Sequence, residues 1–300
     1  KRFELNLEQR YWLAFLFSVS YSVPAAYYIL QEFPDYENVD VKRLERWWGK
    51  HREELLFQTD RRWVKANNRF VRMFQSYEKN VGGSQHDWYK QGFVKQPELN
   101  YDEVFKKTSN FYYYSRYSLF LLLESVKELT GLLIQPSGLN LKDAESSRNG
   151  LCFALGKDSW VGTNLPDEKM EYLQNCLMRI KRVLDFRFPN GRNTFWSIET
   201  SLCAYKKLHL KTRYLGYYID RQQEEILKMQ NRKITGVNWK PLWDFRKEYF
   251  SHKLLGELNG WVGPRPHLRS YFLNTGGFGN VFGEHLESCL SDDCLKEVYG

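Results

Sequence analysis

Residues 117–133, YSLFLLLESVKELTGLL, carry the strongest apolar pattern in the 300-residue chain. Their apolar side chains recur three and four positions apart, which is the spacing of a helix face that is buried against other elements. The apolar stretch 104–133, which contains this segment, is therefore expected to supply the central helix of the core.

The residues before this helix also have helical patterns. Asn6 followed by Gln9 resembles a capping box, and apolar residues at helical spacing then continue until about Pro24. A short second helix is expected over residues 25–30, and Asp40 can cap a third helix.

Residues 135–164 have a different composition, in which Gly, Ser, Asn, Asp and Pro replace periodic apolar residues. A long loop or a boundary between lobes is expected there. Helical patterning resumes at Met170, and further helices are expected over residues 194–208, 215–229 and 239–258.

Strand-like alternation is scarce, so the sequence predicts a mainly α fold. We expect two helical lobes around a central cleft, which together form one catalytic unit. The predicted parts are an N-terminal lobe over residues 1–134, the loop or boundary over 135–164, and a C-terminal lobe over 165–300.

The charge and the aromatic content favour a nucleic-acid or polyphosphate partner. Lys and Arg total 44 against 36 Asp and Glu, which gives a net charge of +8. The chain also contains 20 Tyr, 20 Phe and 10 Trp, and rings beside cations suit stacked bases at roughly 1–3 kcal/mol per base. Most of these rings must belong to the core, so only those flanked by charge are candidates for contact.

Other compositional features exclude several classes. The five cysteines form no C-x-x-C pair, and their odd number fits a reducing cytoplasm better than a disulfide set or a zinc site. The apolar run 11–23 is too short and too polar to span a bilayer. Walker A, G-x-S-x-G and H-E-x-x-H motifs are absent, which disfavours a kinase, a serine hydrolase and a zinc enzyme. The Gly-rich segment 275–283 lacks the dinucleotide-binding spacing and favours a flexible loop, with a backbone cradle for a diphosphate as the alternative.

Residues 57–70, FQTDRRWVKANNRF, combine cations with rings: Arg61, Arg62, Lys65, Arg69, Trp63 and Phe70. If the segment is helical, Arg62, Lys65 and Arg69 share one side and could bind phosphates, while Trp63 stacks on a base. An amphipathic surface helix whose own acid pairs with its arginines is the alternative.

Residues 195–207, FWSIETSLCAYKK, place Glu199, Cys203 and Lys206 at spacings of four and three, so all three share one helical face. A carboxylate, a thiol and an ammonium together could act as a base, a nucleophile and a phosphate clamp. A surface Glu–Lys pair beside a buried cysteine is the alternative.

Residues 213–222, RYLGYYIDRQ, mix charge with rings: Arg213, Tyr214, Tyr217, Tyr218, Asp220 and Arg221. On a helix, Asp220 could hold one arginine and leave the other for an anion, while the tyrosines stack on a base. The segment therefore suits a cleft wall, and an internal ion-pair network is the alternative.

Three segments resemble one known family: LEQRYWLAFLFSVSYSVPAAYYILQEFPD (7–35), ERWWGKHREELLFQTDRRWVK (45–65) and ETSLCAYKK…RYLGYYIDRQ (199–222). It is the amino acid:DNA transferase family of bacteriophage DNA hypermodification, also called α-glutamyl/putrescinyl thymine pyrophosphorylase. The resemblance runs from about residue 3 to residue 250. It implies an all-α fold that has been likened to helical DNA glycosylases, and a place in the bacterial host cytoplasm during infection.

The resemblance also implies a reaction. A separate kinase would pyrophosphorylate 5-hydroxymethyluracil in double-stranded DNA, and this enzyme would displace the pyrophosphate with an amino acid or putrescine to give a hypermodified thymine. The resemblance names no definite cofactor, although Mg²⁺ could accompany the pyrophosphate leaving group.

The candidate residues can be assigned to the steps of this reaction. Glu199 or Asp220 would accept the amine's proton, and Cys203 or Cys152 could add to C6 of the base. Arg61, Arg62, Lys65, Lys206, Arg213 and Arg221 would bind phosphates, and Trp63, Tyr214, Tyr217 and Tyr218 would stack on the extruded base. Two rival functions remain open: a glycosylase-like base-excising enzyme, and a non-catalytic DNA-binding component of a modification complex.

Overall fold

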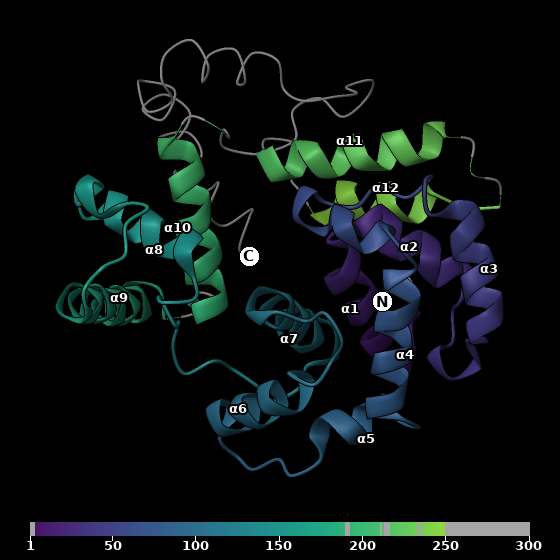
Figure 1. The fold of residues 1–300 in the computed structure, drawn as a ribbon, viewed down its shortest axis with the longest axis horizontal. Coiled ribbons are helices and arrows are strands. Elements are labelled where there is room, and N and C mark those ends of the chain that lie inside the picture. Colours follow the sequence, from purple (N-terminus) through teal and green to yellow (C-terminus); the bar gives the residue numbers. More distant parts are fainter. Residues whose placement is uncertain are drawn as a thin grey trace. The chain divides into compact units, whose positions relative to one another are not determined.

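The structure is a computed structural model that describes residues 4–189, 193–210, 212, 217–232, 234 and 236–249. Over these residues every regular element is a helix, which confirms the mainly α prediction (Figure 1). The chain forms two compact units. Unit 1 comprises Lys1–Pro136 and Glu225–Leu242, and unit 2 comprises Ser137–Glu224 and Trp243–Gly300.

Unit 1 begins with α1 (Leu7–Ser20), which the predicted capping box opens. The Asn6 side chain accepts a hydrogen bond from the Gln9 backbone at 2.9 Å, and the Gln9 side chain accepts one from the Asn6 backbone at 3.1 Å. The helix stops at Ser20 because Tyr21 adopts a left-handed conformation with φ 48°. Pro24 instead lies in the first turn of α2 (Val23–Glu32), where its missing N–H costs nothing.

Six further helical elements follow in unit 1. Asp40 caps α3 (Val41–His51) as predicted, since its side chain accepts from the Arg43 backbone at 2.6 Å. The others are η1 (Tyr36–Asn38) and η2 (Thr59–Lys65), which are 3₁₀-helices, and α4 (Arg69–Val81), α5 (Gln85–Lys90) and α6 (Pro97–Thr108).

The core of unit 1 is organised around α7 (Arg116–Thr130), which confirms that the apolar segment 117–133 supplies a central helix. Residues 118–123 of this helix are buried, and α7 packs along α1. Much of this core consists of rings: Trp12 stacks on Phe15 with centroids 5.3 Å apart and meets the edge of Phe74 at 5.5 Å. Most aromatic residues of the described chain are therefore structural.

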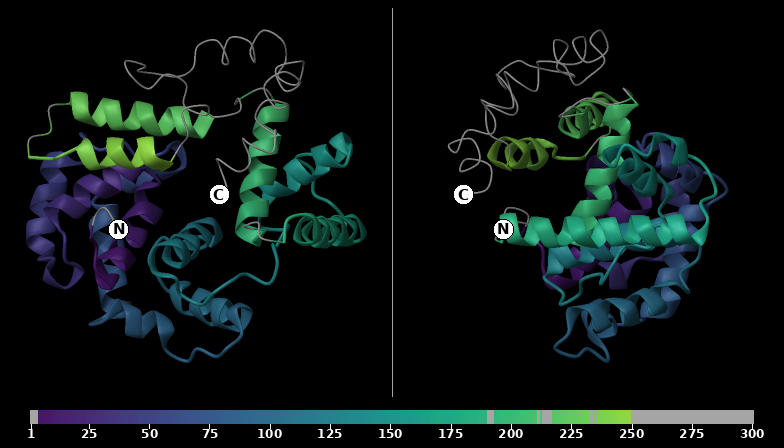
Figure 2. Two further views of the ribbon diagram at one scale, coloured as in Figure 1. Left: turned by 180° about the vertical axis from the view of Figure 1, so that it is seen from behind. Right: turned by 90° about the vertical axis from the view of Figure 1, so that its left-hand side faces the viewer.

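Unit 2 contains α8 (Glu145–Ala154), η3 (Asp158–Trp160), α9 (Asp167–Arg187) and α10 (Phe195–His209). Both α8 and α10 lie on the same side of α9 (Figure 2), and their apolar side chains share a core with it. The segment 135–164, expected to be a loop or a boundary between lobes, is not one continuous loop, because α8 lies within it, and the division between the two units falls after Pro136. The Ser-, Asn- and Gly-rich sequence of α8 has a weak intrinsic helical preference, so packing against α10 stabilises it.

The last two helices are α11 (Tyr217–Asn231) and α12 (Lys240–Tyr249), close to the starts of the predicted segments 215–229 and 239–258. Residues 250–258 of the second prediction lie outside the described residues, as does the Gly-rich segment 275–283. Among the helices that the structure describes, none is both long and apolar enough to cross a membrane.

Candidate active site

The cation-rich segment 57–70 does not form one continuous helix. The 3₁₀-helix η2 ends at Lys65, and α4 starts at Arg69. Between them Asn67 and Asn68 adopt left-handed conformations, with φ 53° and 52°, so the chain changes direction there. The predicted helical stripe of Arg62, Lys65 and Arg69 is therefore wrong.

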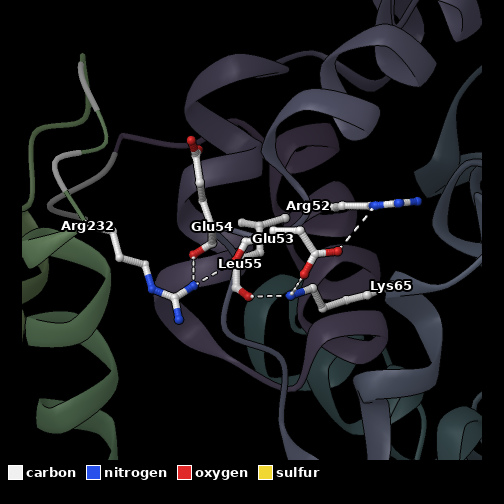
Figure 3. Close-up of polar contacts among 6 residues, drawn as sticks. All are labelled: Arg52, Glu53, Glu54, Leu55, Lys65 and Arg232. Carbon is white, nitrogen blue, oxygen red and sulfur yellow. Dashed lines mark hydrogen bonds and ion pairs between the residues drawn. The ribbon is translucent and has the colours of Figure 1, made fainter.

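Lys65, one of the predicted phosphate ligands, is occupied by local contacts (Figure 3). Its Nζ donates to the Leu55 carbonyl at 3.2 Å and lies 3.3 Å from a Glu53 carboxylate oxygen. Arg232 Nη1 donates to the carbonyl oxygens of Glu53 and Glu54 at 2.9 and 2.6 Å, which ties the segment after α11 to the same turn. Lys65 thus has a structural role in this turn.

Arg61 and Arg62 are consecutive but lie in opposite environments. Arg62 is exposed, whereas Arg61 is only 4% exposed. Arg61 Nε donates to the Ser18 carbonyl at 3.2 Å, and its guanidinium lies 5.3 Å from the centroid of the Tyr117 ring. A buried guanidinium is costly unless its donors find partners, so this position is built to hold a positive charge inside the protein.

Tyr114 extends this internal network. The Ser18 hydroxyl donates its proton to the Phe15 carbonyl at 2.8 Å, so the Ser18 oxygen accepts from the Tyr114 hydroxyl, also at 2.8 Å. Burial raises the pKa of Tyr114, and the hydrogen bond with Ser18 and the charge of Arg61 offset only part of that rise. The phenol is therefore protonated at neutral pH, and it donates this proton to Ser18.

Glu225 brings a carboxylate into the same interior. Its residue is 8% exposed, and its two oxygens accept from Ser22 Oγ at 3.2 Å and from Gln58 Nε2 at 2.5 Å. The Gln58 backbone in turn donates to the Ser20 carbonyl at 3.2 Å and accepts from the Arg61 N–H at 2.8 Å. Glu225 and Arg61 therefore belong to one hydrogen-bonded network.

We refer to these residues as the polar cluster: Ser18, Ser20, Ser22, Gln58, Arg61, Tyr114, Tyr117 and Glu225. Its residues come from the end of α1 and the turn after it, from η2 and the residue before it, from the start of α7 and the turn before it, and from α11, and each of these residues lies in unit 1. A cation, a carboxylate and hydroxyls are the kinds of group that bind small charged molecules and exchange protons with them. The sequence signal was the run FSVSYS (17–22), whose serines alternate with apolar residues.

The predicted residues of α10 belong to unit 2. Glu199 is 4% exposed, and its carbonyl accepts from the Ser147 hydroxyl at 3.1 Å. Cys203 is half-buried, with its Sγ 3.1 Å from Ser146 Oγ. Lys206 is half-buried on the same helix. Glu199 and Cys203 thus lie where α10 packs against α8.

The remaining predictions fall partly outside the described residues. Trp63 is half-buried, and its ring lies 5.3 Å from that of Tyr113. Arg221 is half-buried on α11. Arg213 and Tyr214 lie outside the described residues, as do the side chains of Tyr217, Tyr218 and Asp220. Among the described side chains, no three His, Cys, Asp or Glu gather to form a metal site.

The buried acid, cation and hydroxyls thus share one network within a helical scaffold. Residues 1–214 match the sequence model of the family described as amino acid:DNA transferase. The chain belongs to this family, which confirms the resemblance seen in its sequence. It is also 29% identical over 278 residues to a serinyltransferase of Salmonella phage ViI, a match that covers 84% of this chain and 66% of that relative. The chain thus spans just under two thirds of the relative's length. No solved structure matches it.

Proposed function

We propose that this protein transfers an amino acid to a modified thymine in double-stranded DNA. The amine of the amino acid attacks the 5-methylene of pyrophosphorylated hydroxymethyluracil, and pyrophosphate leaves with the electrons of the broken C–O bond. Family membership supports the reaction class, and the name of the phage relative makes serine the first donor to test. The observation that carries the proposal is the polar cluster, in which Arg61 and Glu225 share one buried network.

In this proposal the polar cluster binds the donor amino acid. Arg61 pairs with its carboxylate, because a guanidinium and a carboxylate match in charge and geometry. Glu225 attracts its ammonium and accepts the proton that must leave before the nitrogen can attack. Glu225 thereby joins Glu199 and Asp220 as a candidate base.

The modified pyrimidine and the pyrophosphate leaving group need binding residues of their own. The modified pyrimidine must leave the DNA stack, because its methylene is crowded inside a duplex. Cations such as Lys206, Arg213 and Arg221 are proposed to stabilise the developing charge on the pyrophosphate. Cys203 is proposed to assist by adding to C6 of the base as a thiolate, and the resulting enolate expels pyrophosphate to leave an exocyclic methylene. The amine then adds to this methylene, and the C6–S bond breaks to restore the C5–C6 double bond and release the thiolate.

The test is a transfer assay on DNA that contains pyrophosphorylated hydroxymethyluracil. The protein is incubated with this DNA and with serine, glycine, glutamate or putrescine, and the DNA is then digested and its nucleosides are weighed by mass spectrometry. Released pyrophosphate is measured in parallel. We expect a thymidine whose 5-methylene is bonded to the nitrogen of one amino acid. One pyrophosphate should be released for each such nucleoside formed. A primary amine in a serine product would place the new bond at the serine hydroxyl and overturn attack by nitrogen.

Matched variants test the polar cluster. Glu225→Gln keeps the shape of the side chain and should reduce kcat about 100-fold or more, which is the range for loss of a general base. Glu37→Gln is the control, since Glu37 is exposed. Unchanged transfer by Glu225→Gln would remove Glu225 from the mechanism. Abasic sites in place of product would establish the glycosylase, and DNA binding without pyrophosphate release would establish the non-catalytic component.

A further inference from the structure

One outer surface of unit 1 carries rings beside arginines. We call it the ring face, and its members are Trp63, Arg69, Arg72, Tyr112 and Tyr113. Tyr113 is 49% exposed, Arg72 is exposed, and the other three are half-buried. The ring face thus presents aromatic and cationic groups to solvent, on residues that are not part of the polar cluster.

The members of the ring face hold one another in place. The rings of Trp63 and Tyr113 lie 5.3 Å apart, and the Arg69 guanidinium lies 5.7 and 5.4 Å from their centroids. Arg69 Nη1 also donates to the Trp63 carbonyl at 2.9 Å. Arg72 lies 5.6 Å from the Tyr112 centroid. Cation–π contacts on both arginines therefore fix the rings in a partly exposed position.

The backbone at this surface is strained. Tyr113 has φ 61°, in the left-handed region that a bulky side chain rarely adopts. The Arg72 side chain donates to the carbonyl of Asn67 at 2.8 Å, and Asn67 is itself left-handed. Strained residues of this kind persist only where the surrounding structure holds them, and they are concentrated at functional sites. Here the strain is associated with a ring that is half exposed to solvent.

The arginines of the ring face are not neutralised by acids. Among the described side chains, Arg69 and Arg72 form no ion pair with Asp or Glu, and their polar bonds go to backbone carbonyls. The exposed Arg62, next to Trp63, likewise forms no ion pair with a described acid. Arg43, by contrast, pairs with Glu32 at 2.7 Å. The surface therefore retains a net positive charge.

We propose that the ring face binds the DNA substrate. Arg72 and Arg62 contact phosphates, and the Tyr113–Trp63 pair stacks on a base that has left the helix. Interleaved rings and cations fit a nucleic acid, because every base has a π-face and every phosphate a charge. The proposal rests on the proposed function only in taking DNA as the partner.

The experiment measures binding of the full chain to fluorescently labelled, unmodified oligonucleotides by anisotropy at several salt concentrations. Tyr113→Asn removes the ring, and Asn tolerates a left-handed conformation, so the variant should fold with an unchanged thermal midpoint. We expect it to bind single-stranded DNA about 5- to 100-fold more weakly. Arg72→Gln should weaken binding to all sequences and reduce the salt slope by about 1.

Two controls match these variants. Tyr172→Asn removes a tyrosine that is 45% exposed on α9, and Arg46→Gln removes an exposed arginine on α3. Both should bind DNA like the wild type. Unchanged affinity in Tyr113→Asn and Arg72→Gln, or an equal loss in the controls, would overturn the proposal. The proposal would also be overturned if these two variants retained DNA binding but lost binding to a protein partner. Because no transfer is measured, the outcome is independent of whether the proposed reaction occurs.

Discussion

Gly150 on α8 provides a sharp test of how unit 2 is held together. A Cβ at this position would lie 2.7 Å from the carbonyl carbon and 3.2 Å from the Cα of Leu202 on α10, and closer still to the Leu202 carbonyl oxygen. Ordinary carbon contacts lie at about 3.5–4.0 Å. The obstructing atoms are backbone, so a rotamer change cannot relieve the overlap. Gly150→Ala must therefore push α8 and α10 apart by about 1 Å.

The magnitude follows from two opposing terms. Replacing Gly by Ala inside a helix stabilises it by about 0.5–1 kcal/mol. Overpacking a close contact costs about 1–3 kcal/mol. The packing cost should be larger, so we expect Gly150→Ala to lower the free energy of unfolding by about 1–2 kcal/mol and the thermal midpoint by about 2–8 °C. Cys203, whose Sγ contacts Ser146 on α8, should also react faster with a thiol reagent.

The assay is thermal unfolding followed by circular dichroism, with thiol labelling of each cysteine mapped by mass spectrometry. Gly49→Ala is the matched control, because Gly49 lies inside α3 and a Cβ there would meet nothing within 4 Å. This control should be more stable than the wild type by about 0.5–1 kcal/mol. A Gly150→Ala protein as stable as the wild type, with unchanged Cys203 labelling, would refute the close packing of α8 on α10.

Three further predictions concern pH, the predicted cations and the thiol. Burial raises the pKa of Tyr11 and Tyr28 to about 12, whereas an unfolded tyrosine ionises near pH 10. Their contribution to stability should be complete below pH 10 and lost as the pH rises toward 12, by up to about 1.4 kcal/mol per pH unit for each tyrosine. Urea unfolding at stepped pH measures this loss. A free energy of unfolding that stays constant between pH 10 and 12 would contradict the prediction. Lys65→Ala should lower the free energy of unfolding by about 1 kcal/mol, since it loses a hydrogen bond to a carbonyl. Arg62→Ala should leave stability unchanged and weaken DNA binding. The reverse pattern would exchange the roles of the two residues. Cys203→Ala should lose nearly all transfer if the thiolate adds to C6, and measurable transfer in the mass-spectrometric assay would instead establish direct displacement.

The sequence by itself determined the features whose signals are local. The capping box at Asn6 and the cap at Asp40 each act within one turn of helix, so they are visible without knowledge of any neighbour. The apolar run 117–133 predicted its own burial in the same way. The segments that resemble amino acid:DNA transferases also identified the family, because they are long and unusual.

Only the tertiary structure decided which polar groups lie inside. Ser22 and Glu225 are 203 positions apart in sequence, and nothing local indicates that they share a hydrogen bond. Arg61 and Arg62 have the same side chain and adjacent positions, yet packing against α1 and α7 buries the first and leaves the second exposed. Burial is a property of what the rest of the chain places around a residue, and sequence periodicity reports it only where a helix is long and its apolar face is continuous.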